Sequence, residues 1–285
     1  MKQKKIRWTL FKTWLTLVVA ATFSGALEGV EVVPVPPTAL SEKPPAIKLL
    51  FPRPYENKHK TPLNIQMRVE DFPLGIVTPF SRANELYNDP DGQSVHVIID
   101  QRPYFAYSQP TGMSLGSDDQ LLSFSLPFSL EPGMHAIRCF PARSYGESFK
   151  EKGCFQAEIF YFQDKKRLDT FPFDRFKPYL TYNEPQGKYP AHRSDPLLLD
   201  FYLSNCTLSP NGYTVRLVID GKQQELLTAW TPYYIKGLKP GRHTIRLELL
   251  DERRQQVPGA FNRVEREIEI EPSTMLEKIP GKAKQ

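Results

Sequence analysis

The stretch LEPGMHAIR at residues 130–138 returns as LKPGRHTIR at residues 238–246, with six of nine positions identical. Each copy follows a strand-like run that ends in Ile-Asp, VHVIID at 95–100 and VRLVID at 215–220. A motif that repeats together with the strand before it predicts two copies of one β-rich module.

A second pair of segments supports the duplication. Pro62 and Pro196 each open a run in which apolar and polar residues alternate, the period of a half-buried strand. The apolar members are Leu63, Ile65, Met67 and Val69 in the first copy and Leu197, Leu199, Phe201 and Leu203 in the second. Because both runs precede their Ile-Asp strand, the copies match over several strands.

We therefore expect an all-β protein of two tandem immunoglobulin-like antiparallel β-sandwiches, each with six or seven short strands. The expected domains are residues 46–162 and 178–271, joined by a connector at 163–177. Aromatic residues in and after the connector are expected to hold the two modules together: Phe171, Phe173, Phe176, Tyr179 and Tyr182.

The first 26 residues have the layout of a secretory signal peptide, with a basic start, an apolar stretch, and Ser24 and Ala26 spaced for cleavage. The uncharged run at 13–26 has 14 residues, fewer than the roughly 20 that a helix needs to span a bilayer. The sequence thus favours an exported protein, secreted or periplasmic, that contacts a membrane only through an uncleaved signal peptide.

Cleavage changes the charge of the protein. Five of the 37 basic residues lie in the first 26 positions, so the mature chain has 32 basic and 32 acidic residues. A neutral chain has no electrostatic basis for general nucleic-acid binding. The Pro-rich stretch at 27–45 is expected to be an extended spacer that builds no sheet ladder, and residues 272–285 form a basic, solvated tail.

The two copies differ in their loops. The first module is longer than the second between equivalent positions, which predicts insertions within residues 70–94 and 101–129. Because loops tolerate insertion and often carry binding surfaces, we expect specific function to reside there.

The second module contains, in order, Ile-Asp-Gly at 219–221, Trp-Thr-Pro-Tyr-Tyr at 230–234, GLKPGRHTIRL at 237–247 and VPGAFN at 257–262. This order resembles immunoglobulin-like or fibronectin type III-like modules of secreted bacterial proteins of unassigned function. The resemblance covers residues 178–271 and extends more loosely to the first module, where Gln101 replaces Gly221 and the Trp-Thr-Pro segment is missing. Such modules occur in adhesins, envelope proteins and accessory domains of extracellular enzymes, so the resemblance implies a fold and a compartment without specifying a substrate.

The repeated histidines are interpreted as structural. His135 and His243 begin a strand after a Pro-Gly turn, with Asp100 and Asp220 as the equivalent acids, and no ligand spacing surrounds either imidazole. We expect no metal and no cofactor. Export permits a disulfide, and Cys139 with Cys154 is the candidate pair, the alternative being two unpaired buried thiols. Cys206 is expected to be a small buried hydrophobe.

Two further patterns have chemical potential. GMSLG at 112–116 matches the G-x-S-x-G motif of serine hydrolases, but the helix that must follow Ser114 is missing from the pattern. The aromatic residues Tyr104, Tyr107, Trp230 and Tyr233 are candidates for stacking on a sugar or anchoring a protein, and packing within the sandwiches is the competing interpretation.

The function predicted from these patterns is that of a non-enzymatic extracytoplasmic protein that binds a protein partner or organises the cell envelope through loops of the first module. The alternatives are a carbohydrate-binding protein that uses exposed aromatic rings and, more remotely, a serine hydrolase.

Overall fold

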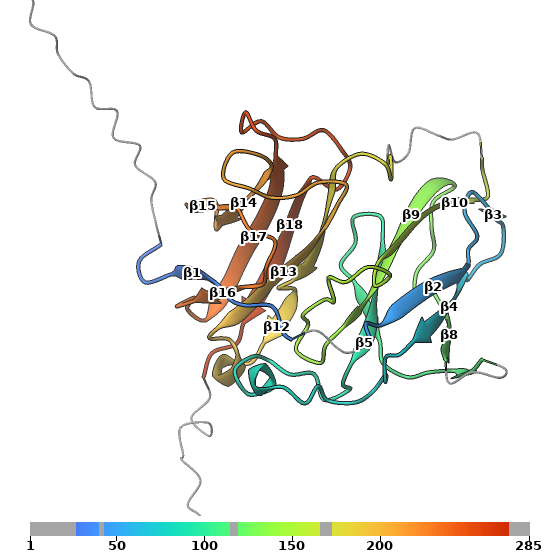
Figure 1. The fold of residues 1–285 in the computed structure, drawn as a ribbon, viewed down its shortest axis with the longest axis horizontal. Coiled ribbons are helices and arrows are strands. Elements are labelled where there is room, and N and C mark those ends of the chain that lie inside the picture. Colours follow the sequence, from blue (N-terminus) through green and yellow to red (C-terminus); the bar gives the residue numbers. More distant parts are fainter. Residues whose placement is uncertain (1–26, 40–42, 115–118, 166–172, 274–285) are drawn as a thin grey trace, which may run out of the picture.

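The repeated stretches form equivalent strands in two β-sandwiches that lie side by side (Figure 1). The computed structural model describes residues 27–39, 43–114, 119–165 and 173–273. Ile99 pairs with Ile137 in the first sandwich, and Ile219 pairs with Ile245 in the second. The sequence repeat is therefore also a repeat of strand register.

The first domain has a four-stranded and a five-stranded sheet. The four-stranded sheet has the order β2 (Ala46–Phe51), β4 (Asn64–Glu70), β8 (Gln120–Ser125) and β7 (Gly112–Met113). The five-stranded sheet has the order β3 (Asn57–Lys58), β10 (Gln156–Phe162), β9 (Gly133–Ala142), β5 (Ser94–Ile99) and β6 (Phe105–Tyr107). Alternate apolar side chains of β4, Ile65, Met67 and Val69, enter the core between the two sheets.

The second domain repeats this arrangement strand for strand. Its four-stranded sheet has the order β11 (Tyr179–Glu184), β13 (Leu197–Ser204), β16 (Tyr233–Lys236) and β1 (Glu31–Pro34). Its five-stranded sheet has the order β12 (Gly187–Tyr189), β18 (Arg263–Ile270), β17 (Gly241–Leu250), β14 (Thr214–Ile219) and β15 (Gln223–Leu227). All pairings between these named strands are antiparallel except β3 with β10 and β12 with β18, and these two parallel pairs occupy equivalent positions in the two domains. The prediction of two tandem immunoglobulin-like sandwiches is confirmed.

The strand β1 corrects the prediction for the Pro-rich stretch. Residues 27–45 were expected to build no ladder, yet Glu31–Pro34 pairs with β16 of the second domain. In the first domain the same position beside β8 belongs to β7, which comes from within that domain. From β1 the chain therefore leaves the second sandwich, crosses to build the first, and returns (Figure 1). The predicted signal peptide, and the predicted tail beyond residue 273, lie outside the described residues.

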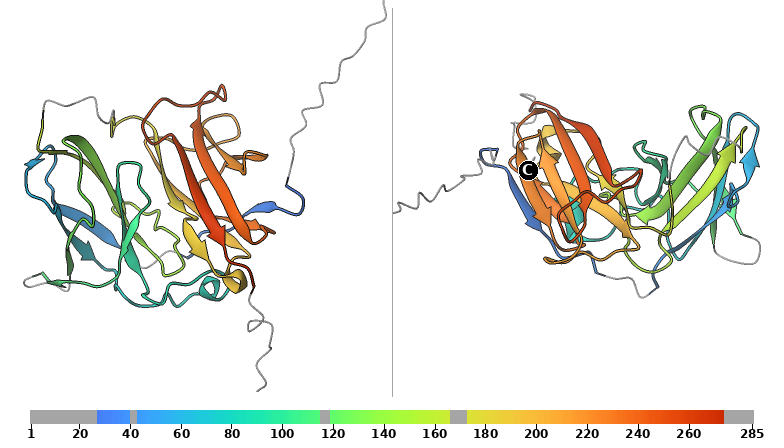
Figure 2. Two further views of the ribbon diagram at one scale, coloured as in Figure 1. Left: turned by 180° about the vertical axis from the view of Figure 1, so that it is seen from behind. Right: turned by 90° about the horizontal axis from the view of Figure 1, so that it is seen from above.

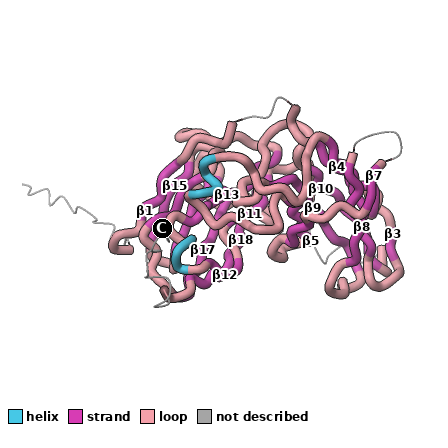
Figure 3. The backbone as a smooth tube through the Cα atoms, turned by 90° about the horizontal axis from the view of Figure 1, so that it is seen from below, coloured by secondary structure: helices cyan, strands magenta, loops and turns pink. Residues whose placement is uncertain are grey.

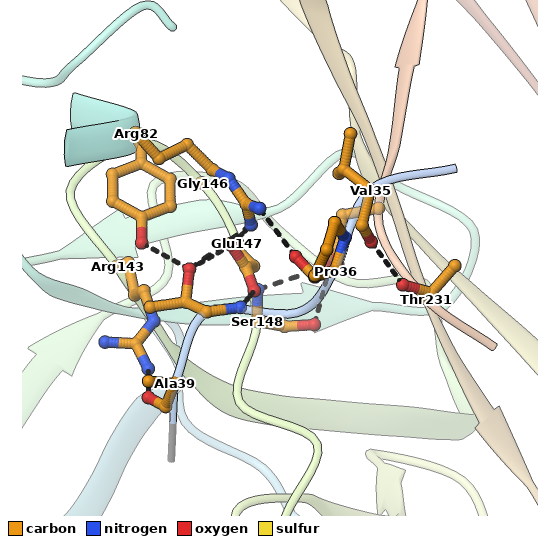
Figure 4. Close-up of polar contacts among 12 residues, drawn as sticks. Val35, Pro36, Ala39, Arg82, Arg143, Gly146, Glu147, Ser148 and Thr231 are labelled. Atoms are coloured by element: carbon orange, nitrogen blue, oxygen red, sulfur yellow. Dashed lines mark hydrogen bonds and ion pairs between the residues drawn. The ribbon is translucent and has the colours of Figure 1, made fainter. Parts of the chain in front are cut away.

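The segment after β1 is fastened to both domains (Figure 4). The hydroxyl of Thr231, in the second domain, donates to Val35 O at 2.5 Å. Buried Arg82, in the first domain, donates to Pro36 O at 2.6 Å and forms an ion pair with buried Glu147. The backbone N–H of Thr38 donates to Glu147 Oε1 at 2.8 Å. The crossing segment is thus a strap that bridges the two sandwiches.

The domains meet through a large buried face. Every residue of β9 is buried, although one side of a sandwich strand normally faces solvent. Two apolar clusters explain this, since Met134 and Ala136 of β9 pack with Phe173 and Phe261, and Phe140 packs with Tyr202 of β13. Figure 2 shows the two sandwiches side by side, seen from behind and from above.

Arg138 is the central polar residue of this interface. Its guanidinium lies 3.4 Å from the centroid of the Phe261 ring and donates to Thr181 Oγ1 at 3.0 Å. It also donates to the carbonyl of Asp100, at the end of β5. Burial lowers the pKa of Arg138 to about 9, so the cation remains charged at neutral pH. One side chain therefore fixes a loop of the first domain against the second.

Candidate functional site

The first insertion forms an anchored loop. Its ends are closed by backbone hydrogen bonds, from Gly75 N to Gln93 O and from Gln93 N to Ile76 O, both of 2.9 Å. Thr78 and Ser144 bond reciprocally, each backbone N–H donating to the other hydroxyl. Gly92 has φ +79°, and a Cβ there would lie 2.5 Å from Gly75 C, so the two ends of the loop approach too closely for a side chain. The loop is therefore fixed at its base.

The far end of this loop reaches the second domain. It contains the short helix η1 (Ser81–Asn84), which lies beside η2 (Ala191–Arg193) of the second domain (Figure 3). Leu86 and Ala83 pack against Leu198. The hydroxyl of Tyr234 donates to Glu85 Oε2 at 2.8 Å. The insertion therefore spans both sandwiches and is held by each of them.

Four large apolar side chains of this loop are exposed. Ile76 is 53% exposed, Val77 46%, Phe80 36% and Tyr87 39%. These are half of the eight large hydrophobic residues that are exposed in the described part of the chain, and they occur within 12 residues. Apolar side chains held outward by a fixed backbone are typical of a protein-binding surface. We refer to Ile76, Val77 and Phe80 as the insertion surface.

The second insertion contributes strand β7 and the turn that leads into β8. Ser114 follows β7 in a hairpin, and its backbone N–H donates to Asp119 O at 2.8 Å. Residues 115–118, which include the rest of the G-x-S-x-G match, lie outside the described residues. A serine between two hairpin strands lacks the strand-to-helix turn of a hydrolase nucleophile.

The two histidines form identical corners. His135 Nδ1 lies 2.8 Å from Asp100 Oδ2, and its Nε2 lies 2.7 Å from Glu131 O. His243 lies 2.7 Å from Asp220 Oδ2 and 2.8 Å from Lys239 O. The second oxygen of each aspartate accepts the N–H of the residue after the histidine. Both aspartates have positive φ, 53° and 51°, so each turns the chain at the end of its strand. These contacts are internal to each sandwich.

The four candidate binding rings do not make one exposed platform. Tyr233 is buried, and its hydroxyl donates to Ala229 O at 2.8 Å. Trp230 is half-buried, and its Nε1 donates to Phe201 O at 2.9 Å. Tyr107 stacks on Phe124 at 3.5 Å between centroids, and Tyr104 donates to Glu184 at 2.5 Å. Each ring is engaged by the protein itself, so the carbohydrate interpretation loses the row of free rings that it requires.

The aromatic residues in and after the connector differ in burial. Phe173, Tyr179 and Tyr182 are buried, and Phe173 packs between the domains. Phe176 is 73% exposed, so it does not hold the modules together as expected. Phe171 lies outside the described residues.

The candidate pair Cys139 and Cys154 does not form a disulfide in this structure, and both thiols are buried and free. Cys154 Sγ instead donates to Pro45 O at 2.8 Å, and Cys139 lies in the apolar core of the first domain. Burial raises the pKa of each thiol to about 12. The alternative, two unpaired buried thiols, matches the geometry. Cys206 is half-buried against the core of the second domain.

Within the described residues, no cluster of three or more His, Cys, Asp or Glu side chains is arranged to hold a metal ion. The same part of the chain contains no helix whose length and hydropathy would suit a bilayer crossing.

No protein-family model matches the chain, and no curated protein matches its sequence. Solved structures do match it. The fibronectin(III)-like modules of Clostridium thermocellum CbhA share 9% identity, with 79% of this chain and 94% of that chain covered and a TM-score of 0.26. The tandem Ig repeats of Dlar share 8% identity, with 80% and 97% covered and a TM-score of 0.22.

Latent PorU from Porphyromonas gingivalis is also similar, at 11% identity with a TM-score of 0.28. The match covers 81% of this chain but only 20% of PorU. At these identities the likeness concerns the fold alone. The chain is thus similar to fibronectin type III-like and immunoglobulin-like proteins.

Proposed function

We propose that this protein is a non-enzymatic extracytoplasmic binding protein, and that the insertion surface is where a protein partner docks. The observation that supports the proposal is the concentration of exposed apolar side chains on one loop that both domains hold in place. Interfaces draw most of their binding energy from a few apolar and aromatic residues on a pre-formed surface. Ile76, Val77 and Phe80 have that character.

The fixed loop matters for affinity. A loop that must be ordered on binding costs about 0.5–1.5 kcal/mol for each side chain immobilised. Here the backbone is already held by Gly75, Thr78 and Gln93 at its base and by Leu86 at its far end. A partner therefore meets a surface that is arranged before contact.

Site-specific photocrosslinking tests the proposal. A photoreactive phenylalanine analogue is placed at position 76 or 80 and, as a matched control, at position 226, because Leu226 is 51% exposed on the edge strand β15 of the second domain. In living cells of the source organism we expect one adduct of defined mass at positions 76 and 80 and none at 226. Absence of that adduct, or an equal adduct at position 226, would refute the assignment.

A second variant separates loss of binding from loss of folding. Ile76→Ser, Val77→Ser and Phe80→Ser combined are expected to abolish competition for the crosslinked partner while the unfolding midpoint changes little, because all three side chains are already exposed. A variant that still competes at the wild-type concentration would count against the insertion surface.

Export is part of the same proposal, and it rests on the layout of residues 1–26. Mass spectrometry of the protein from an extracytoplasmic fraction is expected to give an N-terminus at Leu27. A chain that keeps residues 1–26 and remains in the cytoplasm would contradict the proposed export.

A further inference from the structure

Glu184 differs from the other buried carboxylates of the described residues. Three of these have a cation beside them: Glu147 pairs with Arg82, Asp200 with Lys150 at 2.6 Å, and Glu248 with Arg246 at 3.0 Å. Glu184 is 7% exposed and takes part in none of the ion pairs between described residues. Since a buried charge is normally paired with an opposite one, this exception requires an explanation.

The carboxyl group of Glu184 is held in position by two phenols. Tyr104 donates to Oε1 at 2.5 Å, and Tyr189 donates to Oε2 at 2.8 Å. Gly146, with φ +87°, lets the backbone lie against this group, because a Cβ there would lie 2.8 Å from Oε1. Burial raises the pKa of Glu184 to about 7, although the two hydroxyls oppose that shift. The site therefore orients a carboxyl group that has no cation of the described residues beside it.

This group lines a cavity of about 80 Å³ between the two domains. At about 15 Å³ for each water-sized group, the cavity has room for roughly five of them. The ring-bearing residues that line it with Glu184 are Tyr87, Tyr104, Tyr145, Tyr189 and His96. Tyr87 and Tyr189 meet edge to face with their centroids 6.0 Å apart.

The other charged groups around the cavity do not neutralise Glu184. Lys188 pairs with Glu269 at 3.0 Å, and its side chain is 68% exposed. The guanidinium of Arg143 lies over the Phe149 ring at 4.1 Å and donates to Ala39 O at 3.2 Å. Asp89, which also lines the cavity, adds a second negative charge.

His96 contributes a hydrogen-bond acceptor to the cavity, because its imidazole is neutral. Asn183 Nδ2 donates to Gly146 O at 2.7 Å and to Asp200 at 2.8 Å, so its oxygen must accept from His96 Nδ1, which lies 2.7 Å away. That tautomer leaves a lone pair on Nε2. Burial lowers the pKa of His96 to about 4, so the imidazole is neutral at pH 7.

From the cavity, its rings and its uncompensated carboxylate, we propose that this interdomain site binds the ammonium group of a small organic cation. Glu184 supplies the counter-charge. Tyrosine rings attract a cation that has left water. His96, whose ring stacks on Tyr104 with 3.6 Å between centroids, offers Nε2 as the acceptor for an N–H group. This site is separate from the insertion surface, and neither proposal depends on the other.

Carboxyl NMR on protein labelled with ¹³C in its glutamate side chains tests the proposal, with methylammonium as the probe and ethanol as a neutral control. Methylammonium at ten times its dissociation constant is expected to lower the apparent pKa of Glu184 by about 1 unit, because the cation binds only the ionised form. Ethanol is expected to leave the titration unchanged. No shift with methylammonium, or an equal shift with ethanol, would overturn the proposal.

Variants and inorganic ions sharpen the result. In Glu184→Gln, the saturable shift of the His96 ring signals on adding methylammonium is expected to disappear. In Glu248→Gln, which removes a buried carboxylate from the other face of the second domain, that shift is expected to persist. Equal binding by Glu184→Gln, or an equal response of the wild type to Na⁺ or K⁺, would count against a site for organic cations. The titration of the wild type needs no variant, so a folding failure does not leave the question open.

Discussion

Replacing Asp100 with Asn is expected to change the pH dependence of stability in a defined direction. Both ring nitrogens of His135 face acceptors, the carboxylate of Asp100 and the carbonyl of Glu131, so the corner suits an imidazolium. Burial alone would lower the pKa of His135, but the hydrogen bond and the charge of Asp100 outweigh burial and raise it above 6.5. A raised histidine pKa stabilises the fold below pH 6.5, and this contribution is lost as the pH rises through the folded-state value.

The size of the effect follows from the charge on the hydrogen bond. A bond to a charged group contributes about 1.5–3 kcal/mol and a neutral one about 0.5–1.5 kcal/mol. Asn fits the positive φ of 53° at position 100 and keeps an oxygen for the N–H of Ala136. We therefore expect Asp100→Asn to lower the free energy of unfolding by about 1–2 kcal/mol at pH 5.5 and by clearly less at pH 8.5.

Urea unfolding of the wild type and the variant at both pH values measures this difference. Asp220→Asn is the matched substitution in the second domain, where the same contacts measure 2.7 and 2.8 Å, and it is expected to destabilise the protein because it weakens the same hydrogen bond. A destabilisation by Asp100→Asn that is equal at the two pH values, or absent at pH 5.5, would refute the reasoning.

Three further outcomes are expected. Deletion of residues 27–34 removes β1 from the edge of the second domain and is expected to lower the free energy of unfolding by about 2–4 kcal/mol. Amide exchange is expected to become faster in β16 but not in β8, and unchanged exchange in β16 would contradict the pairing of β1 with β16. Cys139 and Cys154 are expected to react with iodoacetamide only after unfolding, because burial raises the pKa of each thiol to about 12, and a mass two units lower in the exported protein would instead reveal a disulfide. Gly92→Ala is expected to cost about 2–4 kcal/mol, since it strains the backbone and crowds Gly75, and an unchanged melting temperature would disprove this close approach.

The duplicated strands and corners were predictable because their signals are local. An Ile-Asp strand end and a Pro-Gly-x-His turn are each short, and their repetition fixes equivalent positions. The strand β1 was not predictable in this way, because Val32 pairs with Ile235, more than 200 positions later. Its prolines indicated an extended spacer, whereas an edge strand tolerates Pro34 at its end.

The sequence does contain one signal of the domain interface. The outward positions of β9 are Met134, Ala136 and Phe140, whereas the equivalent positions of β17 are Arg242, Thr244 and Glu248. A strand with apolar side chains on both faces is covered on both faces. The comparison of the repeats therefore predicts that the outer face of β9, and not that of β17, packs against the other domain.

Comparison of the two repeats locates the first insertion, but it does not show which residues of the insertion are exposed. Which of its residues face solvent depends on contacts with Leu198 and Tyr234 of the second domain. Likewise, Glu184 lacks an ion-pair partner because no described Lys or Arg side chain lies beside it in the fold, and the sequence alone does not show which side chains become neighbours.

Differential scanning calorimetry tests most directly whether the two sandwiches behave as one body that presents the insertion. Because β9 is buried on both faces and the strap bridges the domains, we expect a single transition whose calorimetric enthalpy equals its van't Hoff enthalpy. Two separate transitions, with the second domain unfolding independently of the first, would contradict the shared framework on which the proposed binding surface depends.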